Sequence, residues 1–177
     1  PASFCGLIGM RPTHNRINTA GVYPMAPSFD TVGWFSKSSD IFQKVGYILL
    51  DKLERSDVHF KQYVIAEDLL ELCDTEVQDN FNNYIDGNLP NTPKINLSKH
   101  SKSLIAENFR ILQGGEVKEN IIPWIEKNNP KISPEIRTRI EMASKITELE
   151  VKKANVFRNK LIEEIETSLP EGTIAIF

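Results

Sequence analysis

The residue types used in nucleophilic catalysis gather in one run of the sequence, Ser98-Lys99-His100-Ser101-Lys102-Ser103. A serine becomes a nucleophile when a neighbouring histidine or lysine removes its proton. That chemistry needs the groups within hydrogen-bond reach and the base held by a third partner, a geometry that adjacent loop residues rarely adopt. We therefore interpret the run as a solvated loop in which Ser101 or Ser103 caps the helix that follows.

Other common site chemistries lack their sequence patterns. The spacing of Cys5 and Cys73 fits neither a zinc ligand pair nor a redox Cys-x-x-Cys motif, and we see no glycine-rich phosphate loop and no metal-ligand spacing. We expect no metal and no organic cofactor. Two free thiols are typical of a reducing compartment, and Cys5, which follows Phe4 in an apolar run, is predicted to be a buried, inert thiol. His59 lies in a charged segment and is predicted to face solvent.

The composition indicates a folded protein with a packed core. Hydrophobic residues make up 40% and charged residues 25% of the 177 residues, which is near the average for globular domains. The formal net charge of −3, from 21 basic and 24 acidic residues, argues against a nucleic-acid partner. No apolar run approaches the roughly 18 residues that suggest a membrane span.

The elements that must position any site alternate between helix and strand. We expect strands at 7–10, 63–66, 94–97 and 173–177, and helices ending at Gly6, beginning at Ser38 or Ser39, and covering 75–85 and 104–117. Residues 15–35 are predicted to be ordered loop, 67–68 a polar break and 87–93 a loop. Ser133-Pro134-Glu135 starts a helix that we expect to run for about thirty residues, as one long surface helix rather than a coiled coil.

The buried faces of two helices are predicted from apolar spacing. For the helix after Ser38 the stripe is Ile41, Phe42, Val45, Ile48, Leu49 and Leu53; for the helix at 75–85, which Thr75 could cap, it is Val77, Phe81, Tyr84 and Ile85. Gly114-Gly115 is expected to weaken the helix that contains it.

One segment of the chain resembles a known family. The stretch 1–13, Asn15-Arg16-Ile17, Gly21-Val22, Pro24 and the run 28–34 (Ser-Phe-Asp-Thr-Val-Gly-Trp) resemble the amidase signature family, with likeness to its plant-type indole-3-acetamide amidases and to the amidase-like receptor of chloroplast protein import. The likeness continues more weakly to residue 177. Asn15 stands where relatives often have glycine, and asparagine tolerates the left-handed backbone that this implies.

The resemblance implies an α/β fold, with part of a mixed β-sheet flanked by helices. Residues 1–177 would form the central to C-terminal part of a single amidase domain, truncated at both ends. In the family the nucleophilic serine lies in a Gly-Gly-Ser-Ile/Val-Arg run immediately before the Pro1-Ala2 position, and the bridging (cis) serine and the lysine lie further upstream. No catalytic residue can therefore be assigned within this sequence.

The resemblance also implies a function. The intact protein would be an amidase that hydrolyses a small carboxylic amide through the Ser-cisSer-Lys triad, and this fragment alone would be inactive. His14, Asp30 and Thr31 are the candidates for substrate binding. A structural role is the alternative for each: His14 could bond local backbone in a turn, and Asp30 could bond the amides of its own loop.

A non-catalytic docking or receptor module, or an inactive fragment, is the alternative reading of the chain. The expected partner is the amide substrate, with a homodimer as a further option, and the expected location is the cytoplasm.

Overall fold

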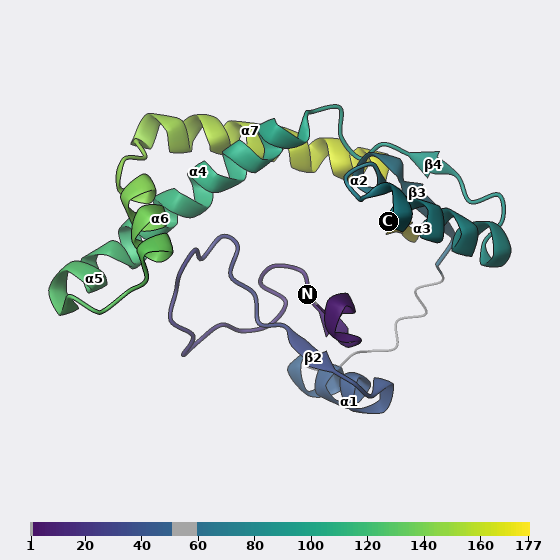
Figure 1. Cartoon of the computed structure of the whole chain (residues 1–177), viewed down its shortest axis with the longest axis horizontal. Helices are drawn as coiled ribbons and strands as arrows, with labels where there is room; N and C mark the ends of the chain where they lie inside the picture. The colour runs from purple at the N-terminus through teal and green to yellow at the C-terminus, as the bar shows by residue number, and fades with distance from the viewer. Residues whose placement is uncertain (1, 51–59) are drawn as a thin grey trace. The chain divides into compact units, whose positions relative to one another are not determined.

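The structure, a computed structural model, describes residues 2–50 and 60–177 (Figure 1). The chain divides into two compact units, one from residues 1–56 and 109–151 and the other from 57–108 and 152–177. The predictions for Leu53 and His59 lie outside the described residues.

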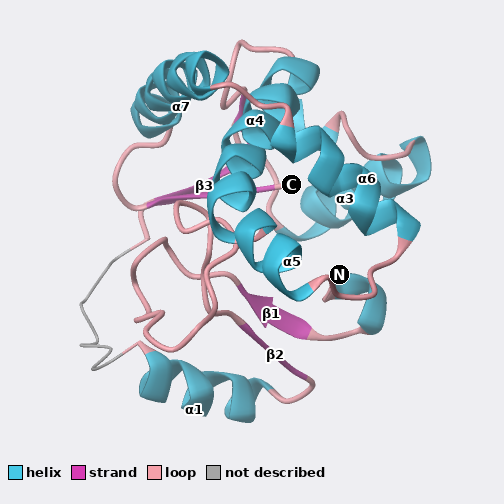
Figure 2. Cartoon of the chain, turned by 90° about the vertical axis from the view of Figure 1, so that its left-hand side faces the viewer, coloured by secondary structure: helices cyan, strands magenta, loops and turns pink. Residues whose placement is uncertain are grey.

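The first unit opens with a single 3₁₀ turn and a two-stranded sheet. The turn, η1 (Ser3–Cys5), ends at Gly6 in a left-handed conformation with φ of 60°, which confirms the predicted helix end. Strand β1 (Ile8–Met10) pairs antiparallel with β2 (Trp34–Ser36), with Gly9 opposite Phe35 (Figure 2). The prediction of loop up to residue 35 is wrong for the last two residues, because β2 is too short to show an alternating pattern.

Helix α1 (Ser39–Leu49) packs on β2 through an indole ring. The Ser38 hydroxyl accepts a hydrogen bond from the Ile41 N–H at 3.4 Å, so the predicted cap is confirmed. Trp34 donates its Nε1–H to the Phe42 carbonyl at 3.1 Å and forms a small core with Ile17, Leu50 and apolar residues of α1. The predicted stripe is wrong at Ile41 and Ile48, which are 52% and 77% exposed.

Four helices lie after β4 (Lys94–Ile95) in the sequence. They are α4 (Lys102–Asn120), α5 (Ile122–Asn128), α6 (Pro134–Ser144) and α7 (Glu148–Ser168). Helices α4 and α7 each have residues in both units. Gly114 and Gly115 do not end α4. Gly115 is buried, and a Cβ added there would lie 2.9 Å from Val151 Cγ2. These glycines allow close approach of a neighbouring segment.

The long helix predicted from Ser133 is two helices. Its start is confirmed, since the Ser133 hydroxyl accepts from the Ile136 N–H at 3.4 Å. The chain then breaks between Ser144 and Glu148, where Thr147 and Glu150 form a capping box: the Thr147 N–H donates to Glu150 Oε2 at 2.8 Å, and the Glu150 N–H donates to Thr147 Oγ1 at 3.3 Å.

The second unit contains a three-stranded parallel sheet. Its strands are β3 (Gln62–Ala66), β4 (Lys94–Ile95) and β5 (Thr173–Ile176), in the order β4-β3-β5. Together with the antiparallel pair in the first unit, this confirms the α/β class with sheets flanked by helices. The strands predicted at 63–66, 94–97 and 173–177 are confirmed with small changes at their ends.

Two helices lie between β3 and β4. Residues 67–68 are not a polar break but the start of α2 (Glu67–Leu70), and α3 (Thr75–Asn88) runs past the predicted end at 85. Asp74, not Thr75, occupies the N-cap position. The core joins Ile65 and Leu70 to Phe81 and Ile85, whereas the other two residues of the predicted α3 face are exposed, Val77 at 51% and Tyr84 at 63%.

Candidate functional site

A self-closed turn at residues 25–30 of the first unit carries one of the predicted site residues, Asp30. Asp30 Oδ2 accepts the N–H groups of Met25 and Ala26 at 3.0 and 3.1 Å. The Ala26 carbonyl accepts the N–H groups of Phe29 and Asp30 at 2.8 and 2.9 Å. Asp30 therefore bonds the amides of its own loop, as the structural alternative predicted.

The carbonyls of the same turn are held by two side chains from the segment after β1. His14 Nε2 lies 2.7 Å from the Pro27 oxygen, and Arg11 Nη2 donates to the Phe29 oxygen at 3.0 Å. A carbonyl oxygen only accepts, so the His14 hydrogen bond requires a proton on Nε2. The other ring nitrogen, Nδ1, is then the atom of His14 through which a ligand could be contacted.

Sequence reasoning missed a carboxylate that anchors this turn. Glu116 of α4 accepts the Ser28 N–H at 2.8 Å through Oε2, and the two residues are 88 positions apart in the chain. In the sequence Glu116 carried no signal beyond its place on one side of a helix. The substrate-binding role of His14, Asp30 and Thr31 stays a prediction; Thr31 is half-buried beside the turn in sequence.

The serine, histidine and lysine run forms no nucleophile with its base. The Ser101 hydroxyl accepts the Leu104 N–H at 3.3 Å, which confirms the capping interpretation. His100 Nε2 lies 3.3 Å from Glu164 Oε1, and its ring packs 4.9 Å from Phe157. The imidazole is thus paired with a carboxylate of α7.

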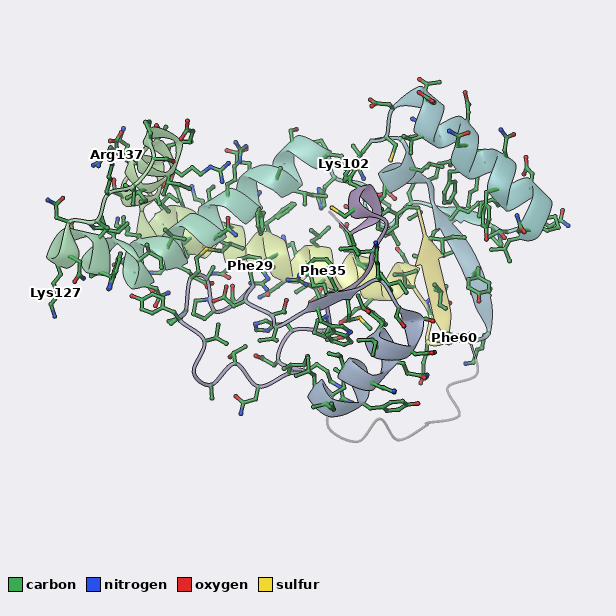
Figure 3. The ribbon with its side chains drawn as sticks, turned by 60° about the horizontal axis from the view of Figure 1, so that its bottom comes forward. Phe29, Phe35, Phe60, Lys102, Lys127 and Arg137 are labelled. Atoms are coloured by element: carbon green, nitrogen blue, oxygen red, sulfur yellow. The ribbon has the colours of Figure 1, made fainter. Side chains whose placement is uncertain are left out.

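The second missed residue is Asp68, the one polar side chain classed as buried among the described residues. Its carboxylate accepts the N–H groups of Leu97 and Ser98 at 3.1 and 3.3 Å and pairs with Lys102 Nζ at 2.7 Å (Figure 3 labels Lys102). Burial raises the pKa of the Asp68 carboxyl, but the Lys102 bond and charge and the two backbone bonds outweigh it, so that the pKa is lowered. Asp68 ties α2 to the segment after β4.

The prediction for Cys5 is wrong. Both cysteines are free thiols, and Cys5 is exposed, next to a Phe4 side chain that is 95% exposed. Because η1 is a single 3₁₀ turn, it is too short to form an apolar face that could be buried against other described residues. In the described part of the chain, no group of three or more His, Cys, Asp and Glu side chains is placed to hold a metal ion.

The turn at 25–30 lies in a part of the chain that is similar to known proteins. A family model described as "Amidase" matches residues 1–57. "Amidase 1" of Arabidopsis thaliana is 30% identical over 208 aligned residues, which cover 99% of this chain and 49% of that protein. The chain belongs to the amidase signature family.

Two further comparisons extend this family assignment. A crystal structure of an amidase matches 95% of this amidase-family chain with a TM-score of 0.80, at 19% identity, and the match covers 39% of that structure's chain. "Translocon at the outer membrane of chloroplasts 64" of Pisum sativum is 25% identical over 99% of this chain and 35% of its own length. The chain thus spans between a third and a half of the length of these curated relatives.

The segment that the family model matches contains the predicted site residues but not all of the residues that hold the turn. His14, Asp30 and Thr31 lie inside residues 1–57, as does Arg11, whereas Glu116 lies outside the segment that the family model covers. The family pattern therefore marks the turn but not the carboxylate that holds it.

Proposed function

We propose that the protein carrying this chain is an amide-bond hydrolase that acts on a small carboxylic amide. The supporting observation is the 30% identity with Amidase 1 across 99% of the chain, rather than across the signature segment alone. In the family mechanism a serine attacks the amide carbonyl, a bridging serine and a lysine move the proton, and backbone N–H groups bind the oxyanion. These groups would come from sequence before residue 1.

In this proposal the chain supplies a wall of the substrate site. The turn at 25–30 is rigid because its own hydrogen bonds close it, and His14 Nδ1, Asp30 Oδ1 and the Thr31 hydroxyl are the polar atoms it would offer to an amide. The chain alone would not hydrolyse amides. No cofactor is needed, since the reaction is a hydrolysis in which water replaces the amine on the acyl group.

A non-catalytic docking or receptor module is the second candidate. The observation that favours it is the match to the pea translocon protein over 99% of the chain. A fold does not fix a function, and an amidase fold can persist without the nucleophile. The two candidates differ at one position, the residue that aligns with the family's nucleophilic serine.

The test is an ammonia-release assay on the protein with its complete natural coding sequence. The panel would contain indole-3-acetamide, other aryl amides and short aliphatic amides, because changes in an apolar pocket shift preference by only about 1–3 kcal/mol. We expect release that is lost when the serine of the Gly-Gly-Ser-Ile/Val-Arg run before Pro1-Ala2 is replaced by alanine, and none from residues 1–177 alone. Release that survives this replacement, or a protein that lacks the serine and hydrolyses no amide, would reject the proposed mechanism.

We further propose a cytoplasmic location and a homodimer. Two free thiols support a reducing compartment. None of the described helices is long and apolar enough to cross a membrane. Imaging of a fluorescent fusion would test the location, with the surface of plastids as the opposing outcome. Light scattering at several concentrations would show whether the mass is that of one chain or two.

A further inference from the structure

The 25–30 turn is closed on itself and tied to α4 from outside. Asp30 and the Ala26 carbonyl hold the N–H groups of Met25, Ala26, Phe29 and Asp30, and Pro27 has no N–H to bond. The Ser28 N–H points out of this arrangement to Glu116. The internal bonds fix the shape of the turn, whereas the Glu116 bond, together with the bonds from Arg11 and His14, fixes where the turn lies.

The contacts between this loop and α4 include three on one side of the helix. Besides the Ser28–Glu116 bond, the Tyr23 hydroxyl donates to the Asn120 carbonyl at 3.3 Å, and the Phe29 ring meets Phe109 edge-on with centroids 5.0 Å apart (Figure 3 labels Phe29). The three helix positions are spaced by seven and four residues, which places them on one face. Asn120 also donates its side-chain amide to the Glu116 carbonyl at 2.8 Å, so the two anchors support each other.

The Glu116 bond is the strongest of the three contacts. A bond from a backbone N–H to an ionised carboxylate is about twice as strong as one between neutral groups. The Tyr23 bond is long at 3.3 Å and ends on a neutral carbonyl, and Phe109 is 43% exposed. Among these three contacts the half-buried Glu116 carboxylate is the main anchor of the turn on α4, while His14 and Arg11 hold the turn from the segment after β1.

We propose that Glu116 is a positioning residue for substrate binding, which acts by holding the 25–30 turn and, through it, Asp30 and Thr31. The proposal rests on the proposed amidase function for its substrate part. Without Glu116 the turn keeps its shape, because the Asp30 bonds do not involve α4, and it keeps its bonds to Arg11 and His14 but is held less firmly on the side of α4. Substrate binding would weaken, whereas the chemical step, which uses residues outside this chain, would change little.

The first test is amide hydrogen exchange of the chain followed by NMR in Glu116→Ala. We expect exchange of the Ser28 amide to rise by about ten-fold or more, as the loss of a bond to a charged group implies, while the Met25 and Ala26 amides change by less than about three-fold. Glu116→Gln, which keeps an acceptor, should restore most of the protection. Glu119→Ala removes an exposed carboxylate from the same helix and is the matched control.

The pattern of exchange decides between positioning and a merely structural role. A uniform rise at Met25, Ala26 and Ser28 would mean that Glu116 only stabilises the fold, and it would overturn the proposal. An unchanged Ser28 amide would do the same. If Glu116→Ala fails to fold, Glu116→Gln decides, with a selective rise of about three-fold at Ser28 expected from the weaker neutral acceptor.

The second test is steady-state kinetics of the complete protein. Glu116→Ala should raise KM by about ten-fold and leave kcat within about three-fold, because only binding is affected. A fall in kcat of about ten-fold with unchanged KM would overturn the proposal that Glu116 supports substrate binding. A wild-type protein without amidase activity would reject the proposed function, while the exchange pattern would still decide whether Glu116 positions the turn.

Discussion

Replacement of Asp68 by asparagine should destabilise the second unit more than any change of an exposed carboxylate. Asp68 is 7% exposed, and its carboxylate accepts three hydrogen bonds, from the Leu97 and Ser98 N–H groups and from Lys102 Nζ. Asparagine keeps one oxygen that can accept a backbone N–H. It loses the charge, the second acceptor and the ion pair, so the segment after β4 is held to α2 by one neutral bond.

The size of the loss follows from what is left unpaired. Breaking a fully buried ion pair costs about 3–5 kcal/mol, since the remaining charge is trapped. The Lys102 side chain is 31% exposed and can turn to water, which reduces that cost. One bond to a charged acceptor contributes about 1.5–3 kcal/mol. We expect a loss of about 2 kcal/mol for Asp68→Asn and about 3 kcal/mol for Asp68→Ala, which removes both backbone acceptors.

The difference between wild type and Asp68→Asn should depend on pH in one direction. The pKa of the folded carboxyl is lowered, because the bonds from Lys102 and the backbone outweigh the effect of burial, which raises it. A group with a lowered folded pKa adds stability above its unfolded pKa, and the contribution disappears as pH falls through the folded value. The difference should thus be constant near neutral pH and shrink below about pH 4.

The assay must report the second unit separately. Trp34 and Trp124, the two tryptophans of the chain, both lie in the first unit, so fluorescence follows that unit. Hydrogen exchange of peptides that cover β3, measured by mass spectrometry, follows the second. Asp79→Asn, an exposed change on α3, is the control and should stay within about 0.5 kcal/mol of wild type. Equal exchange in the two variants, or a difference that persists unchanged in acid, would refute the reasoning.

Three other changes test packing, capping and exposure. Gly115→Ala should lower the free energy of unfolding by about 1 kcal/mol, because the added Cβ meets the stiff Val151 side chain; a gain of stability in urea unfolding would contradict this. Thr147→Ala should cost about 1 kcal/mol in the same assay and Thr147→Ser much less, and equal values would argue against the capping box. Cys5 should react with a thiol reagent faster than Cys73, and Cys5→Ser should change stability by less than about 0.5 kcal/mol; slower labelling of Cys5 would show that it is covered.

Features set by neighbouring residues could be predicted from the sequence. Ser38 and Ser133 cap their helices, and Asn15 has a left-handed backbone with φ of 63°. In each case the hydrogen bond or the torsion involves residues at most three apart in the chain. Both partners can therefore be recognised from a short stretch of sequence. The break at Thr147 was of this kind as well. It was missed because the apolar spacing continues across it, although Thr-x-x-Glu is a known start signal.

Features set by distant partners could not be predicted. Apolar spacing shows that α1 has a hydrophobic stripe, but not that the core around Trp34 takes in Phe42, Val45 and Leu49 and leaves Ile48 exposed. Strand β2 exists because β1 pairs with it. Asp68 looked like a residue of a polar break, and its burial depends on N–H groups about thirty positions later in the chain.

The candidate site shows the same division, with a consequence for how a family match is used. His14, Asp30 and Thr31 fall in the matched segment 1–57, and the turn there closes through bonds between near neighbours. The bond that ties the turn to α4 comes from Glu116, outside that segment. If the turn binds substrate as we propose, a relative could keep every residue of the matched segment and still lose substrate affinity through a change on α4. For this turn, the residue at the Glu116 position, and whether it can accept a hydrogen bond, is more informative to compare between active and inactive relatives than the residues of the matched segment.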